Sequence, residues 1–173
     1  MRCYYIEYHG LIITIDNLIL VLNHKTVDYL QMIKKNIKKI LVPIDGSKNS
    51  MRGLDEAIYL ARQCHATITG LYVIPIYPRN FTDVIMPYQI HLTKSAKKFM
   101  ESAKTICAQK GIMFKSKIIF GSPSLEIDEM AKKKGFDTIV IGSRGESGLK
   151  EIFLGSVANA VVHKSKIPVL VIK

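Results

Sequence analysis

The feature that most constrains this chain is a regular alternation of strand-like and helix-like segments from Ile37 to the C-terminus. Short apolar segments rich in β-branched residues predict strands at 38–45, 66–74, 113–121, 138–143 and 167–173. Apolar residues at helical spacing predict helices between them, at 49–64, 91–110, 122–134 and 156–163. This order predicts one α/β domain, with an open five-stranded parallel sheet, right-handed crossovers and helices on both faces.

Two local features of this pattern carry their own expectations. Asn49 or Ser50 is expected to cap the first helix, because both side chains accept hydrogen bonds from helix N–H groups. Residues 75–90 contain three prolines and are expected to form a long loop, of the kind that is functional or mobile in compact domains.

Residues 1–36 do not join the alternation. Their most apolar stretch, 11–22, has twelve residues and includes Asp16 and Asn17, whereas a membrane-spanning helix needs about 20 apolar residues. We predict that 1–36 form an extension outside the core domain of 37–173, with Met32 as an alternative start. An accessory hairpin or a dimer arm remains the other interpretation.

The 173 residues carry a net charge of +11, nearly all of it within 37–173, and 48% of them are apolar. A basic globular domain attracts anions, whether nucleotide phosphates, nucleic acid or an acidic membrane surface. Cys3, Cys64 and Cys107 are far apart and show no metal-binding spacing, so a reducing, cytoplasmic setting is expected. Cys64 and Cys107 are interpreted as small core residues rather than reactive thiols.

The strand at 138–143 leads into a glycine-rich segment with the spacing G-x2-G-x9-G-[ST]. Its members are Gly142, Gly145, Gly155 and Ser156. Glycines let the backbone turn and approach a ligand closely, and the first N–H groups of the following helix form an anion site. The segment therefore predicts phosphate binding, and a tight strand-to-helix connection capped by Ser156 is the alternative.

Further residues of this corner have predicted roles. The backbone N–H groups of Val157 and Ala158 complete the phosphate cradle, and Arg144 and Lys150 are candidates to meet phosphate charge. Each of these two cations is equally well explained as a solvated surface charge. The spacing is neither the dinucleotide fingerprint nor the P-loop, whose lysine steadies phosphates during transfer.

Asp45 follows the first core strand, at the sheet edge where ligands of parallel sheets bind. It is predicted to bind ribose hydroxyls or a Mg²⁺ ion beside phosphates, or else to cap the following helix or the Asp-Gly turn. Pro43 and Ile44 are candidates to wall a base pocket, and Val73 offers backbone hydrogen bonds to an adenine. Pro43, Ile44 and Val73 are equally well explained as core residues.

Together, "ILVPIDGS" (40–47), "GLYVI" (70–74) and the segment 139–173 resemble the universal stress protein family. The resemblance implies a Rossmann-like sheet of order 3-2-1-4-5, and ATP binding for members that carry the glycine segment. It implies adenine at Val73 and Pro43–Ile44, ribose or metal at Asp45, and phosphates at Gly142, Arg144, Gly145 and 155–158. Ala158 departs from the Ser or Thr often found there. A homodimer through 168–173 is also implied.

The predicted function is therefore ATP binding, with Mg²⁺ bound through the nucleotide, in a regulatory stress response. The alternative is a slow ATP hydrolase or nucleotide-handling enzyme, although the sequence has no recognisable catalytic set and His91 and His163 stand alone. A nucleic-acid binder is a third option, suggested by Lys132–Lys134 and by Lys115 and Lys117, but no nucleic-acid motif accompanies them.

Overall fold

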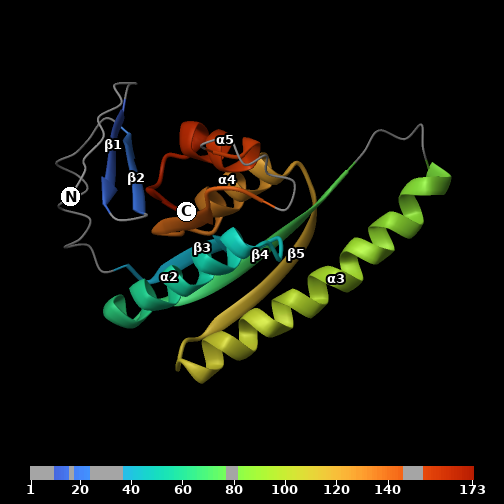
Figure 1. The fold of residues 1–173 in the computed structure, drawn as a ribbon, viewed down its shortest axis with the longest axis horizontal. Helices are drawn as coiled ribbons and strands as arrows, with labels where there is room; N and C mark the ends of the chain where they lie inside the picture. The colour runs from blue at the N-terminus through green and yellow to red at the C-terminus, as the bar shows by residue number, and fades with distance from the viewer. Residues whose placement is uncertain (1–9, 16–17, 24–36, 77–81, 146–153) are drawn as a thin grey trace.

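The computed structural model describes residues 10–15, 18–23, 37–76, 82–145 and 154–173 (Figure 1). Side chains are described for 37–76, 89–145 and 154–173. Within these ranges the chain forms a single sheet with helices on both faces, as the alternation predicts. None of the helices in the described part combines the length and apolar character required to cross a membrane.

The sheet has the strand order β1-β2-β7-β6-β3-β4-β5 across the described ranges. Its strands are β1 (Gly10–Ile15), β2 (Leu18–Asn23), β3 (Lys39–Pro43), β4 (Thr67–Pro75), β5 (Phe114–Gly121), β6 (Thr138–Gly142) and β7 (Val169–Ile172). The five strands from β3 to β7 pair in parallel and, counted from β3, have the order 3-2-1-4-5. The predicted parallel core and its strand order are confirmed.

Four helices connect the parallel strands in the described ranges. They are α2 (Lys48–Cys64), α3 (Thr82–Gln109), α4 (Pro123–Lys133) and α5 (Ser156–Lys164). Figure 1 shows α2 and α3 on one face of the sheet and α4 and α5 on the other. Because side chains alternate along a strand, each parallel strand contributes side chains to both faces of the sheet.

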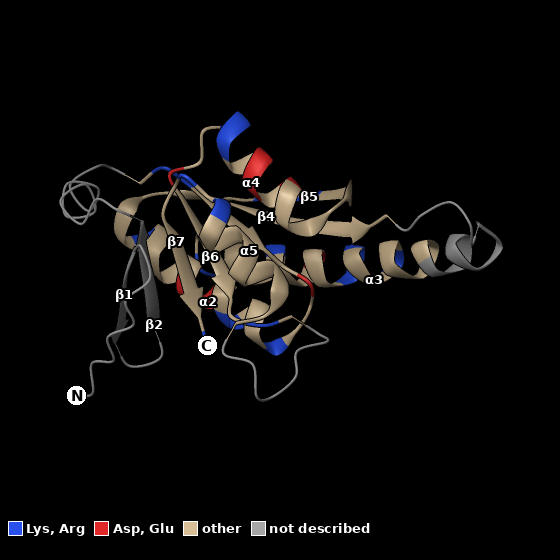
Figure 2. Ribbon diagram, turned by 90° about the horizontal axis from the view of Figure 1, so that it is seen from above, with Lys and Arg blue, Asp and Glu red and all other residues tan. Residues whose placement is uncertain are grey.

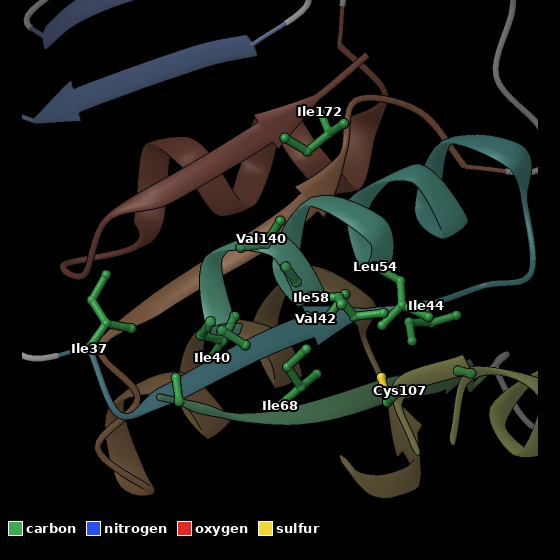
Figure 3. Close-up of a cluster of buried hydrophobic side chains, with 14 of the residues drawn as sticks. Ile37, Ile40, Val42, Ile44, Leu54, Ile58, Ile68, Cys107, Val140 and Ile172 are labelled. Atoms are coloured by element: carbon green, nitrogen blue, oxygen red, sulfur yellow. The ribbon is translucent and has the colours of Figure 1, made fainter. Parts of the chain in front are cut away.

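The alternation divides the core into two clusters. Ile40 and Val42 of β3 pack with Leu54 of α2 and Met100 of α3, and Figure 3 shows part of this cluster. Leu41, on the opposite face of β3, packs with residues of α4 and α5. All five residues of β6 are buried, as expected for a strand covered on both faces.

The charged side chains are distributed over several elements. Figure 2 shows Lys and Arg on α3, α4 and α5 rather than on a single element. On α4, Lys132 pairs with Asp128 and Lys133 with Glu129, both at i,i+4 spacing. Part of the lysine run considered as a nucleic-acid patch is therefore engaged in ion pairs along its own helix.

Two predictions about local structure are wrong. The segment 75–90 is not one long loop, because α3 already begins at Thr82 and includes Pro87. Pro87 is the sixth residue of α3, beyond its first turn, so the helix continues there with one i→i−4 hydrogen bond missing. The cap of α2 is Ser47 rather than Asn49 or Ser50, and its hydroxyl accepts from the Ser50 N–H at 3.2 Å.

The N-terminal segment adds a feature beyond the five predicted strands. β1 and β2 form an antiparallel hairpin, and β2 pairs antiparallel with β7, with Leu18 opposite Ile172 and Val21 opposite Val169 (Figure 1). The backbone of 10–15 and 18–23 thus matches the accessory hairpin, which was the other interpretation of residues 1–36 in the sequence. The boundary between 1–36 and 37–173 and the alternative start at Met32 stay predictions.

Candidate functional site

The candidate site lies at the carboxyl ends of the parallel strands. β3 is the first parallel strand, and it pairs with β4 on one side and with β6 on the other. The chain therefore leaves β3 and β6 at the same edge but toward opposite faces, which is the topological switch point where ligands of such sheets bind. The loops after β3 and β6 are neighbours for this reason.

The turn after β3 is held by its own side chains. The Asp45 carboxylate accepts a hydrogen bond at Oδ1 from the Ser47 N–H at 3.0 Å. The Asp45 N–H approaches the Ser50 hydroxyl at 3.4 Å, and Gly46 adopts a φ of +84°. The turn role expected as the alternative for Asp45 is therefore present, and it fixes the direction of the carboxylate.

The same carboxylate lies against the glycine segment, one hundred residues later in the chain. A Cβ atom added to Gly145 would lie 2.6 Å from the Asp45 Oδ2 atom, which is closer than non-bonded atoms approach. No side chain fits at position 145 while Asp45 keeps this position. The structure thus brings together two residues that the sequence assigned to the site independently.

Gly142 is required for a close backbone approach. A Cβ atom at Gly142 would lie 2.6 Å from the backbone carbonyl of Asn49, so β6 lies directly against the start of α2. The sequence predicted that Gly142 and Gly145 let the backbone turn and approach closely without a Cβ atom in the way. Neither is among the glycines with positive φ in the described ranges, so they provide space and not an unusual backbone angle.

Gly155 returns the chain to the strand end. Its N–H donates to the Ser143 carbonyl at 2.8 Å, and a Cβ atom on it would lie 3.3 Å from the Arg144 Cα atom. Gly155 is the N-cap of α5 and provides no side-chain cap. Its carbonyl accepts from the Asn159 N–H at 2.9 Å, the first bond of the helix.

The first turn of α5 therefore opens beside the carboxyl end of β6. The N–H groups of Ser156, Val157 and Ala158 precede the first i→i−4 donor, Asn159, and helix geometry gives them no partner within α5. Ser156 is exposed, Val157 is half-buried and Ala158 is buried. Only Ser156 presents a polar side chain here, so the other two can act on a ligand through their backbone.

The residues assigned to a base pocket are mostly core. Ile44 is 1% exposed, its N–H donates to the Leu71 carbonyl at 2.9 Å, and Val73 is buried against α4 and α5. β4 pairs with β3 only as far as Leu71 but continues along β5 to Pro75. Val73 therefore lies beyond the last residue of β4 that pairs with β3. Its backbone groups on the β3 side can meet a ligand.

The remaining predicted residues have mixed outcomes. Arg144 is half-buried between Ser143 and Gly145, whereas Lys150 lies outside the described residues. The sequence reasoning missed Ser143, whose hydroxyl is fully buried without a hydrogen-bond partner among the described residues. Its position directly after a fully buried strand was the available signal.

Side chains for a protein-only metal site do not gather in the described part. No cluster of three or more His, Cys, Asp or Glu residues occurs there, and His91 and His163 are both exposed. Burial and the charge of Asp55 raise the pKa of the Cys107 thiol to about 11, and its side chain is fully buried on the α2–α3 side of the sheet. The interpretation of Cys107 as a core residue is confirmed.

A separate cavity of about 350 Å³ lies between α3 and the end of β5. Its lining includes Ile90, Lys94 and Lys97 of α3 and Phe120 of β5. It contains none of the residues predicted from the sequence. The candidate site is therefore defined by the contacts of the glycine segment and not by this cavity.

Comparisons with known proteins agree with this architecture. The model of the Universal stress protein family matches residues 36–173. The universal stress protein YxiE of Bacillus subtilis (strain 168) is 38% identical over 148 residues, which cover 78% of this chain and 98% of that protein.

Two solved structures show the same likeness. The universal stress protein UspA from Lactobacillus plantarum superposes with a TM-score of 0.74 at 26% identity, covering 80% of this chain and 99% of that one. The universal stress protein from Archaeoglobus fulgidus in complex with dAMP has a TM-score of 0.59 at 25% identity, covering 80% of this chain and 99% of that one.

Proposed function

Because this chain belongs to the universal stress protein family, we propose that it binds ATP where the loops after β3 and β6 meet. The observation that carries the proposal is the contact between Asp45 and Gly145, which places a carboxylate beside the glycine segment. A related structure contains dAMP, which shares the adenine and one phosphate of ATP. The proposal extends that chemistry to the triphosphate.

The phosphates would lie against the first turn of α5. The N–H groups of Ser156, Val157 and Ala158 and the helix dipole favour negative charge, and the exposed Ser156 hydroxyl adds a donor. Gly142, Gly145 and Gly155 let this corner pack closely against the start of α2, the Asp45 carboxylate and the Arg144 backbone, and Arg144 adds positive charge beside the phosphates.

The nucleoside would lie on the other side of Asp45. The Asp45 carboxylate accepts hydrogen bonds from ribose hydroxyls or shares a Mg²⁺ ion with the phosphates. Because the described residues include no clustered metal ligands, the remaining Mg²⁺ ligands would be phosphate oxygens and water. The adenine would contact the Val73 backbone, the half-buried Pro43 and the buried Ile44.

The proposed role is regulation through nucleotide binding in the cytoplasm rather than turnover. Bound ATP adds negative charge to the protein and can change which partner it binds. Either effect is sufficient for regulation and requires no catalytic residues. β2 pairs along the edge of β7 that a homodimer through 168–173 would use. We therefore propose such a homodimer only for chains in which β2 is detached from β7.

The test is calorimetric titration of the full chain with ATP, with and without Mg²⁺. Gly145→Val places methyl groups where the Asp45 carboxylate lies, and we expect at least a tenfold loss of ATP affinity. The matched control is Gly111→Asn, at a φ of +72° with open space around it, in a conformation that Asn tolerates. The control is expected to bind as the original chain does.

Equal ATP affinity in Gly145→Val and in the control would remove the glycine segment from the binding site. Mass spectrometry of small molecules released from freshly purified protein would identify the natural nucleotide independently. A salt-sensitive complex with DNA, in the absence of ATP binding, would instead support the nucleic-acid alternative.

A further inference from the structure

The two outer strands of the parallel core differ in how they are protected from pairing with another chain. β5 carries Lys115 and Lys117, both exposed, and charged residues on an edge strand discourage pairing. β7 has the sequence VLVI and carries no charge. An unprotected apolar edge of this kind requires a cover.

We propose that the N-terminal hairpin, β1 and β2, is a built-in cover for the β7 edge that competes with a second copy of this chain. β2 pairs with β7 over four residues, from Leu18 opposite Ile172 to Val21 opposite Val169. A strand edge accepts one partner at a time, so a second copy can pair with β7 only when the hairpin has left it.

The sequence of the hairpin suits this interior position. β2 reads LILVLN, and it carries no charged residue that would discourage pairing along either of its edges. An isolated two-stranded hairpin is marginally stable at best in water, so β1 and β2 gain stability from the third strand that β7 supplies.

The connection to the core allows the hairpin to pair within its own chain. β2 is antiparallel to β7, so Asn23 lies at the end of the sheet where β3 begins at Lys39. Three strand spacings separate β2 from β3, or roughly 14 Å. The fifteen residues 24–38 connect β2 to β3, and we call them the tether. Fully extended they can span up to about 50 Å, which is more than the distance between the two strands.

The tether also decides the competition. Tethering within one chain gives β2 an effective concentration at β7 on the order of millimolar, whereas a second copy must reach that concentration in solution. The intramolecular hairpin is therefore expected to exclude the pairing of two β7 strands at micromolar protein concentrations. This separates the present chain from the homodimer expected from the family resemblance.

Disulfide trapping in the full chain tests the inference. In a background of Cys3→Ser, Cys64→Ser and Cys107→Ala, the pair Leu20→Cys with Leu170→Cys places thiols at opposed positions of β2 and β7. Opposed residues of antiparallel strands have Cα distances that a disulfide spans. We expect mild oxidation at micromolar concentration to give an intramolecular disulfide, seen as a monomer on a non-reducing gel in which neither cysteine can be alkylated until the protein is reduced.

The matched control shifts one cysteine by one residue. Val21→Cys with Leu170→Cys places the two side chains on opposite faces of the sheet, so little disulfide is expected. Trapping that is equally efficient in both pairs, or a disulfide that links two chains in the first pair, would overturn the inference.

A second measurement does not depend on cysteine chemistry. Ile19→Pro with Val21→Pro removes two N–H donors from β2 and prevents regular pairing. We expect faster hydrogen exchange at 169–172 than in the original chain at low concentration, and concentration-dependent self-association as the protein is concentrated. Unchanged exchange at 169–172, with the rest of the sheet still protected, would contradict the cover.

Discussion

At the scale of single residues, Asp45 has two structural relationships at once. One carboxylate oxygen accepts a hydrogen bond within its own turn, and the other lies where a side chain at Gly145 would be. The turn and the proposed ligand contact therefore do not compete, because the turn aims the carboxylate at the glycine segment.

The substitution Asp45→Asn separates the charge of this residue from its turn. Asparagine keeps an oxygen that can accept from the Ser47 N–H, but it lacks the charge that would hold Mg²⁺ or accept strongly from ribose. We expect about a tenfold loss of ATP affinity in the presence of Mg²⁺, or about 1.4 kcal/mol, with unchanged thermal stability. Calorimetry and a melting curve check both values, and unaltered affinity would assign Asp45 to the turn alone.

A second residue-scale prediction concerns Cys107. Its pKa is raised to about 11 from 9.0, so the folded thiol stays neutral while the unfolded one ionises above pH 9. The contribution of Cys107 to stability is thus present below pH 9 and lost as pH rises toward 11. In a Cys3→Ser chain, we expect iodoacetamide to label partly exposed Cys64 at pH 8 long before Cys107, measured by peptide mass spectrometry. Equal labelling rates would contradict this burial.

The sequence could predict which residues lie at the site but not how they meet. The spacing around Gly142 and the position of Asp45 after a strand were visible in the chain. The contact between Asp45 and Gly145 depends on β3 pairing with β6, a long-range contact that local pattern does not encode. The glycines also proved necessary for space rather than for positive φ, which only the packing of β6 on α2 reveals.

At the scale of elements, the helices differ in how they begin. Ser47 caps α2 through its hydroxyl, whereas Ser122 stands at the same position of α4 without a side-chain cap bond. In both cases the serine carbonyl accepts the first helical bond, so alanine would keep that part of the start.

This difference provides a matched pair of variants. We expect Ser47→Ala to lower the free energy of unfolding by about 1 kcal/mol, because the Ser50 N–H loses its acceptor. Ser122→Ala is expected to cost less than half of that. Urea denaturation of both variants measures the difference, and equal losses would show that the Ser47 hydroxyl bond contributes little.

Element types were predictable where the pattern was long and regular, and boundaries were less so. α4 begins with Pro123 and ends before Gly135, whose φ is +61°, as the capping signals indicate. The start of α3 was missed by nine residues because Pro87 was interpreted as a loop signal. Pro87 is the sixth residue of α3, past the first turn that tolerates proline, so local sequence rules favoured a loop at this position.

At the scale of the whole molecule, the chain carries a net charge of +11, and the ligand proposed for its site is a polyanion. The charge is distributed over several elements (Figure 2), so it acts as a general attraction more than as a specific contact. Such fields raise association rates and are screened by salt.

Ionic strength should therefore affect the charged ligand selectively. We expect the association rate of ATP to fall about tenfold between 50 and 500 mM salt, measured by stopped-flow fluorescence of a labelled nucleotide. Adenosine provides the uncharged control, and its binding should change little over the same range. A similar salt dependence for both ligands would show that the field of the molecule does not steer ATP.

The parallel core was predictable as a whole because alternating elements allow few topologies. The place of the N-terminal hairpin was not, although an accessory hairpin was one interpretation of residues 1–36. Its place beside β7 arises from tertiary pairing between residues about 150 positions apart, which leaves no periodic trace in the sequence.

The bond from the Gly155 N–H to the Ser143 carbonyl has a practical consequence for protein engineering. It fastens together the two ends of residues 146–153, so a peptide inserted between them would leave both flanks at their original separation. Lengthening a closed loop costs only a fraction of a kcal/mol per doubling. An epitope tag or a fluorescent reporter grafted at this point is therefore expected to leave β6 and α5 in place.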